Sequence, residues 1–216
     1  MTESPAYCPL CDDRHISHYF QDDQRDYWQC KNCKLVFVAG NQHMNEADEK
    51  QRYDLHNNSI DDAGYCAFLG KLLEPLSRRL PEAATGLDFG CGPGPTLSLL
   101  LEQRGFKVSC YDKYYADDES LLEKQYDFIT STEVLEHLRE PKQVLERLIS
   151  NLKPQAYLGV MTQLLPAASQ FSKWHYKKDQ THICFYSDDT FKWIAERWGL
   201  ALEILDKDVI ILQRGN

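Results

Sequence analysis

Four of the eight cysteines lie near the N-terminus and are spaced as two pairs. Cys8 and Cys11 form one C-x2-C unit, and Cys30 and Cys33 form another. Each unit can direct two thiolates to one point, so the two together can complete the tetrahedral sulfur site that Zn²⁺ prefers. Two disulfides or four free thiols are the alternatives. We expect zinc, and a structural one, because protein ligands would fill all four positions.

A second candidate site is the segment LDFGCGPG, in which Gly90, Gly92 and Gly94 follow an apolar run that ends near Phe89. The pattern predicts a buried strand, a glycine turn and a helix from Thr96 to Arg104, which is a frame that binds anions or nucleosides. The segment lacks the G-K-[ST] of a P-loop, and its third glycine comes one residue too early for the dinucleotide fingerprint.

Two acidic residues indicate what this turn would bind. Asp88 lies two positions before the first glycine, where a carboxylate suits an ammonium group better than a pyrophosphate. Asp112 ends the predicted strand FKVSCYD, where a carboxylate can accept hydrogen bonds from both hydroxyls of a ribose. We therefore expect a ligand that carries a ribose and a positive charge.

With the later segment YDFITSTEVLEHL, these motifs resemble class I S-adenosylmethionine-dependent methyltransferases over about residues 60–213. The resemblance implies S-adenosyl-L-methionine as cofactor, with the glycine loop near its methionine part and Asp112 at its ribose. Tyr53 and His56, ahead of this core, are candidates for a lid over the cofactor, although a helical cover without chemistry is the alternative. The cofactor residues implied in this way are Asp88, Gly90, Cys91, Gly92, Gly94, Asp112, Thr132 and Glu133, with Tyr53 as the covering residue.

Three histidines are candidates for a catalytic base, because an imidazole can accept a proton at neutral pH. His137 follows Glu133 by four residues, and the resemblance puts this segment at the pocket. His175 and His182 lie in the stretch after the fifth expected strand, where the family usually places substrate contacts. His182 is our preferred base, and a structural hydrogen bond is the alternative role for each of the three.

The expected fold is α/β, with a Rossmann-like methyltransferase sheet that is mostly parallel and has an antiparallel C-terminal hairpin. The stretch 113–127 lacks an apolar run, so we expect the family's usual third strand to be reduced or absent. Tyr114 or Tyr115 is then a candidate to stack on the adenine, with surface packing as the alternative. We divide the chain into a zinc-ribbon-like domain (1–40), a connector and helical cover (41–82) and a cofactor-binding methyltransferase domain (83–216).

Three helices outside the glycine loop are also expected. The segment DDAGYCAFLGKLLEPLSRRL has apolar residues close to helical period, and Pro75 should kink or interrupt this helix. EPKQVLERLISNLKP predicts an amphipathic helix that Lys153 and Pro154 end. SDDTFKWIAERWG predicts a helix that begins at a Ser187 cap and ends at Gly199.

Composition narrows the possible partners. The net charge of −9 makes nucleic acid an unfavourable partner without excluding it. The N-terminus lacks the basic and apolar stretches of a secretion signal, and no apolar run is long enough to span a bilayer, so we expect a cytoplasmic protein without membrane contact. The oligomeric state does not follow from the sequence.

Three hypotheses about function remain at this point. The first is a small-molecule O- or C-methyltransferase (EC 2.1.1.-) in which a pocket histidine removes the proton. The second keeps the methyltransferase but makes RNA the substrate, since a zinc ribbon precedes this core in an rRNA guanine methyltransferase. The third is a catalytically silent protein that binds a partner and no cofactor.

Overall fold

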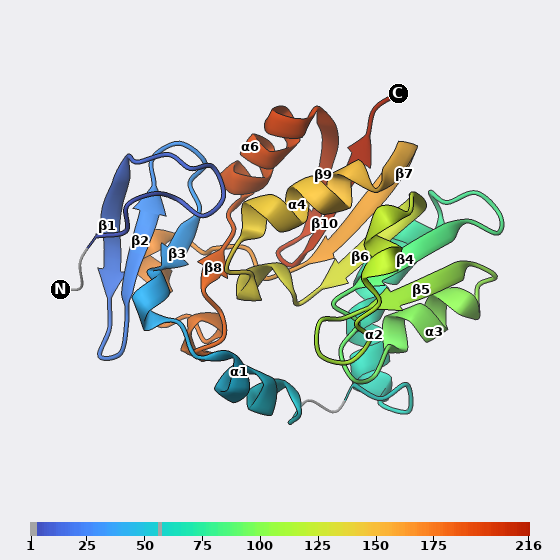
Figure 1. The fold of residues 1–216 in the computed structure, drawn as a ribbon, viewed down its shortest axis with the longest axis horizontal. Coiled ribbons are helices and arrows are strands. Elements are labelled where there is room, and N and C mark those ends of the chain that lie inside the picture. The colour runs from blue at the N-terminus through green and yellow to red at the C-terminus, as the bar shows by residue number, and fades with distance from the viewer. Residues whose placement is uncertain (1–3, 56–57) are drawn as a thin grey trace.

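The computed structural model describes residues 4–55 and 58–216, which form a small sheet and a large sheet (Figure 1). The small sheet has the order β1-β2-β3-β8, and the large sheet has the order β5-β4-β6-β7-β10-β9. The strands are β1 (Ile16–Gln21), β2 (Asp26–Cys30), β3 (Val36–Val38), β4 (Thr85–Phe89), β5 (Lys107–Tyr111), β6 (Tyr126–Thr132), β7 (Leu152–Met161), β8 (Cys184–Phe185), β9 (Leu200–Asp206) and β10 (Val209–Arg214).

Helices cover both faces of the large sheet and connect the two sheets. The α-helices are α1 (Glu46–Tyr53), α2 (Ala63–Ser77), α3 (Thr96–Glu102), α4 (Pro141–Ser150), α5 (Ala168–Phe171) and α6 (Asp188–Trp198). Short 3₁₀ helices are η1 (Gly40–Gln42), η2 (Glu119–Glu123), η3 (Leu135–His137) and η4 (Tyr176–Lys178). None of the helices described is long and apolar enough to cross a membrane.

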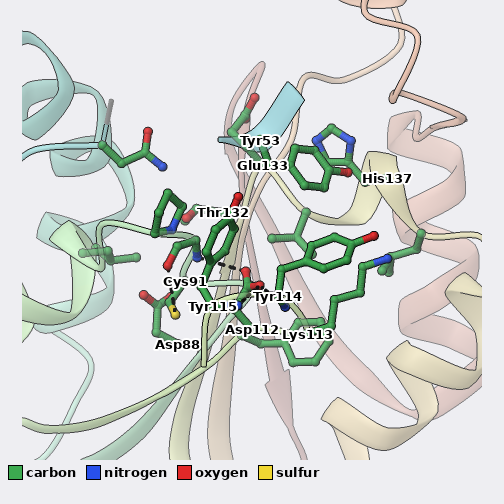
Figure 2. A pocket seen from close by; sticks show the side chains of 18 of the residues that line it. Tyr53, Asp88, Cys91, Asp112, Lys113, Tyr114, Tyr115, Thr132, Glu133 and His137 are labelled. Atoms are coloured by element: carbon green, nitrogen blue, oxygen red, sulfur yellow. Dashed lines mark hydrogen bonds between the residues drawn. The ribbon is translucent and has the colours of Figure 1, made fainter. Parts of the chain in front are cut away.

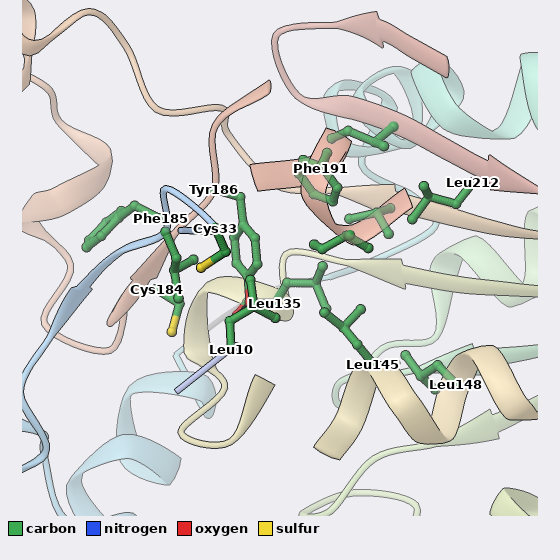
Figure 3. Packing of buried hydrophobic residues seen from close by; sticks show 14 of the residues in the cluster. Leu10, Cys33, Leu135, Leu145, Leu148, Cys184, Phe185, Tyr186, Phe191 and Leu212 are labelled. Atoms are coloured by element: carbon green, nitrogen blue, oxygen red, sulfur yellow. Dashed lines mark hydrogen bonds between the residues drawn. The ribbon is translucent and has the colours of Figure 1, made fainter. Parts of the chain in front are cut away.

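Successive side chains of a strand point to opposite faces of the large sheet, and each face packs against its own set of helices. In β10, Ile210 and Leu212 belong to the cluster that includes α4 and α6, whereas Val209 and Ile211 belong to the cluster that includes α2 and α3. Figure 3 shows side chains of α4 and α6 packed around Leu212. Because both faces are buried, β10 reads as a continuous apolar run rather than as an alternating pattern.

The large sheet confirms the predicted topology. Strands β5, β4, β6 and β7 are parallel, and β10 pairs antiparallel with both β7 and β9. After β5, the chain forms only an isolated bridge between Asp112 and Ala116 and the turn η2 before β6 begins. In the described part of the chain, therefore, no third strand lies between β5 and β6.

Element boundaries differ from expectation at two prolines. Helix α2 runs to Ser77, two residues past Pro75, which we expected to kink or interrupt it. Pro154, expected to end α4, instead lies inside β7, which begins at Leu152. The register of β7 against β6 shifts from Leu152 to Tyr157, and β10 pairs only with 157–161, so Pro154 lies outside the paired segments and its missing N–H costs no ladder bond.

The small sheet is completed by a strand from the far end of the sequence. Val36 and Phe37 of β3 pair antiparallel with Phe185 and Cys184 of β8. Beside this pairing, the buried Arg25 donates to the carbonyl oxygens of Gln180 at 3.1 Å, Asp179 at 3.1 Å, His182 at 2.9 Å and Lys177. The cysteine-bearing N-terminal segment and the loop before β8 are thus held to each other by strand pairing and by one guanidinium.

Candidate functional site

A cavity of about 720 Å³ lies where strands β4, β5 and β6 end, which is the edge of an open α/β sheet where ligands bind. Its volume falls within the roughly 300–1,000 Å³ of small-molecule sites. The glycine loop, α1 and the loop before β8 line it. Among the described residues, it brings together those predicted for the cofactor or for catalysis: Tyr53, Asp88, Gly90, Cys91, Gly92, Gly94, Asp112, Thr132, Glu133, His137, His175 and His182.

The glycine loop needs its glycines for two different reasons. Gly90 and Gly92 have φ values of 77° and 65°, a region that disfavours residues with a Cβ. Gly94 has no Cβ because one would lie 2.1 Å from the carbonyl oxygen of Asn58. The loop therefore combines a left-handed turn with a close approach of the segment that precedes α2.

Asp88 is 2% exposed and links three elements. Its Oδ1 accepts a hydrogen bond from Thr130 of β6 at 2.7 Å, and its Oδ2 accepts one from Ser98 of α3 at 2.9 Å. Burial raises the pKa of this carboxyl. Asp88 thus fixes the glycine loop against the sheet and α3, a role that its position in the sequence does not reveal.

Asp112 ties the end of β5 to the glycine loop. Its Oδ2 accepts from the backbone N–H of Gly92 at 3.0 Å, and its Oδ1 accepts from the N–H groups of Tyr114 at 2.8 Å and Tyr115 at 3.2 Å. Figure 2 shows Asp112 close to Cys91, with Tyr114 and Tyr115 following it. A carboxylate held in this way has its direction set by the backbone before any ligand binds.

Helix α1 covers the cavity and is held by one buried carboxylate. Glu49 accepts hydrogen bonds from Tyr53 at 2.9 Å and from Arg139 at 3.1 Å, and Lys113 lies 3.6 Å from it. The Tyr53 ring lies 5.2 Å from the His137 ring, centroid to centroid. Tyr115 donates to Asp54, at the end of α1, at 2.7 Å. His56, the other predicted lid residue, lies outside the described residues.

Two carboxyl groups follow β6: Glu133 is partly buried and lines the cavity, whereas Glu136 is fully buried and does not line it. Glu133 has a φ of 54°, a strained conformation for a residue other than glycine. The Tyr176 hydroxyl contacts Glu136 and also lies 3.2 Å from Oε2 of Glu133. Burial raises the pKa of both carboxyls, and the charge of Glu136 raises that of Glu133 further.

The three predicted histidines occupy different surroundings. His137 donates from Nδ1 to the carbonyl oxygen of Thr181 at 3.1 Å, and His182 donates from Nδ1 to that of Tyr176 at 2.7 Å. Their rings lie 4.7 Å apart. His175 is exposed, with Nε2 3.4 Å from the side-chain amide of Gln163. His137 and His182 therefore form a pair, and His175 stands apart from it.

Several residues of the site were not predicted from the sequence. Glu136 belongs to the motif EVLEHL, and its spacing from Glu133 and His137 is the sequence signal that could have identified it as a site residue. Glu49, Arg139 and Tyr176 come from segments without a motif, and only the folded chain brings them to the cavity.

The four N-terminal cysteines fit a zinc ion. A tetrahedral site with Zn–S bonds of about 2.3 Å has sulfur atoms about 3.8 Å apart. The Sγ atoms of Cys8 and Cys33 are 3.5 Å apart, and those of Cys11 and Cys30 are 3.4 Å apart. All four lie within 4.8 Å of one another, and no disulfide joins them. The predicted donor set is therefore assembled as a structural zinc requires.

Comparison with known proteins identifies the family. A family model described as "Methyltransferase domain" matches residues 62–204. No curated protein sequence gives a significant match. A solved O-methyltransferase family protein from Burkholderia thailandensis is similar, with a TM-score of 0.55 at 14% identity over 79% of this chain and 61% of that chain.

Two further solved structures share the fold. A putative sarcosine dimethylglycine methyltransferase from Galdieria sulphuraria has a TM-score of 0.51 at 20% identity, covering 67% of each chain. A chain from a complex between the Haloferax volcanii Trm112 methyltransferase activator and a putative methyltransferase has a TM-score of 0.50 at 12% identity, covering 73% of this chain and 96% of that chain. At these identities the likeness concerns the fold alone.

Proposed function

The chain belongs to the methyltransferase domain family of S-adenosylmethionine-dependent enzymes, and from this premise we propose that it methylates a small molecule bound in the cavity. The observation that carries the proposal is the cavity itself, which is continuous from the glycine loop and Asp112 to the histidines. One end has the groups that a nucleoside needs, and the other has polar groups suited to a methyl acceptor.

We assign the cofactor end to the glycine loop and Asp112. The cofactor supplies an electrophilic methyl group on a positively charged sulfur. Asp112 accepts the ribose hydroxyls, for which its carboxylate retains lone pairs beside the backbone N–H groups that orient it. Gly94 lies close to the backbone of Asn58, so the glycine loop is narrow where it faces the methionine part of the cofactor. Tyr114 or Tyr115 stacks on the adenine base.

We assign the acceptor end to the wall beyond Thr132. Methyl transfer needs an aligned nucleophile, exclusion of water and, for a hydroxyl or carbon acid, removal of a proton. Helix α1, held by Glu49 to Arg139, excludes water from above this wall. His175 lines the same cavity and is available to receive the acceptor's proton. The net charge of −9 favours a small acceptor over RNA.

Binding of S-adenosylhomocysteine tests the assignment. Two hydrogen bonds from a ribose to a charged group contribute about 1.5 kcal/mol or more each, so Asp112→Ala should weaken binding by about 100-fold. Asp117→Ala is the matched control, because this nearby carboxylate is exposed and does not line the cavity. Isothermal titration calorimetry measures both. Unchanged affinity in Asp112→Ala would remove the ribose assignment, and no binding by the unaltered protein would favour the catalytically silent hypothesis.

A further inference from the structure

Three side chains of types that bind metals lie together beside the acceptor end of the cavity, which two of them, His137 and His182, line. Glu136 and His137 come from η3, and His182 comes from the loop before β8. One ligand atom from each lies within 4.8 Å of the others. Figure 2 shows His137 and Glu133 at one end of the cavity, away from Asp88 and Cys91 at the other.

Backbone contacts orient both imidazoles in the same sense. Nδ1 of His137 faces the carbonyl oxygen of Thr181, and Nδ1 of His182 faces that of Tyr176. A carbonyl oxygen only accepts hydrogen bonds, so the neutral rings carry their proton on Nδ1 and their lone pair on Nε2. Metal-binding histidines are oriented by outer partners of this kind.

The carboxyl groups of the cluster are only partly compensated. Oε1 of Glu136 accepts a hydrogen bond from the Tyr176 hydroxyl and lies 3.9 Å from Nε2 of His137. Glu136 is fully buried, and its Oε2 has no hydrogen-bond partner among the described residues. Oε1 of Glu133 is likewise buried and without a partner in the described ranges. No lysine or arginine within residues 4–55 and 58–216 forms an ion pair with either group. A buried carboxylate in this situation is costly unless a cation accompanies it.

We propose that Glu136, His137 and His182 form a site for a divalent cation, separate from the cysteine site, with Glu133 available as a fourth ligand. A set of two imidazoles and carboxylates suits Mn²⁺, Fe²⁺ or Zn²⁺, whereas four thiolates select Zn²⁺. Three protein ligands leave coordination positions open toward the cavity. The open positions distinguish this site from the closed site of the ribbon.

The cation indicates the acceptor's chemistry, an inference that rests on the function proposed above. It binds a hydroxyl oxygen of the acceptor and lowers that oxygen's pKa. The hydroxyl proton passes to His175, the oxygen forms the new bond to the methyl carbon, and the electron pair of the broken sulfur–carbon bond stays on sulfur. This favours O-methylation of an acceptor that presents a hydroxyl, or two neighbouring oxygens, to the metal.

Binding of Mn²⁺ to the zinc-loaded protein tests the site without reference to activity. Mn²⁺ binds thiolates weakly, so it does not displace zinc from the cysteines, and its electron paramagnetic resonance signal reports the bound fraction. We expect about one Mn²⁺ per chain. Glu136→Gln, which keeps the side-chain shape, should weaken binding by more than the roughly 10–100-fold that loss of an outer partner costs. His175→Ala, altered in the same cavity but outside the cluster, should leave it unchanged.

The outcomes separate this proposal from the proposed function. A protein that binds S-adenosylhomocysteine but no Mn²⁺, Co²⁺ or additional Zn²⁺ overturns the metal site and leaves the cofactor assignment standing. Equal loss of Mn²⁺ binding in Glu136→Gln and His175→Ala also overturns it. Retained Mn²⁺ binding in a protein that binds no S-adenosylhomocysteine supports the metal site and removes the proposed function. His137→Ala and His182→Ala provide a second pair of variants should Glu136→Gln fail to fold.

Discussion

Replacing Arg25 by alanine should destabilise the whole chain rather than the N-terminal segment alone. The guanidinium is buried and donates to four backbone carbonyl oxygens, those of residues 177, 179, 180 and 182. Removing the donor costs about 1 kcal/mol for each carbonyl that loses its hydrogen bond. Loss of all four therefore lowers the free energy of unfolding by about 4 kcal/mol, a large share of the roughly 5–15 kcal/mol of a typical domain.

Urea unfolding of the zinc-loaded protein measures this loss. Arg14→Ala is the matched control, because Arg14 is an exposed arginine of the same segment and its removal should cost less than about 0.5 kcal/mol. Arg25→Lys keeps the charge but cannot span four carbonyls, so it should fall between the two. A loss of less than about 1 kcal/mol in Arg25→Ala, or one equal to that of the control, would refute the anchoring role.

Two further variants test the ribbon and the glycine loop. Metal analysis should find one zinc fewer in Cys30→Ser than in the unaltered protein, and this variant should have a lower melting temperature. Cys66→Ser, outside the cluster, should hold as much zinc as the unaltered protein, and a Cys30→Ser protein that did the same would exclude the four-cysteine site. The raised pKa of Asp88 means that its contribution to stability is present below about pH 4 and is lost as pH rises through the native value. Asp88→Asn should therefore gain stability relative to the unaltered protein as the pH rises above about 4 in thermal unfolding, and a difference that does not change with pH would contradict this.

The sequence-based predictions were most accurate where a few neighbouring residues determine the structure. The C-x2-C spacing of the N-terminal cysteines and the G-x-G-x-G turn each occupy a few residues, and in each case chemistry constrains those residues directly. Ser187 and Gly199 bound α6 as predicted, because a cap and a left-handed residue are specified by single side chains. The predicted cofactor and catalytic residues that the structure describes line the cavity, and the roles assigned to them stay predictions.

Contacts between distant segments could not be predicted. Strand β8 has only two residues, too few for a periodic signal, and its partner β3 is far away in the sequence. The bond from Arg139 to Glu49 likewise joins a loop to a helix that is separate in sequence. The prediction for Pro154 was wrong because the sequence alone does not distinguish a proline that ends a helix from one in an unpaired part of a strand. Only the register of β7 against β6 separates the two cases.

The pairing of β3 with β8 determines the order in which parts of this protein can fold during synthesis. During synthesis the cysteine segment leaves the ribosome first, and the edge of β3 stays unpaired until residues 184–185 emerge. An open strand edge invites pairing with other chains. Zinc capture by the four cysteines can occur throughout this interval but leaves the β3 edge open, so the time needed to synthesise the chain as far as β8 sets how long the nascent chain is exposed to aggregation.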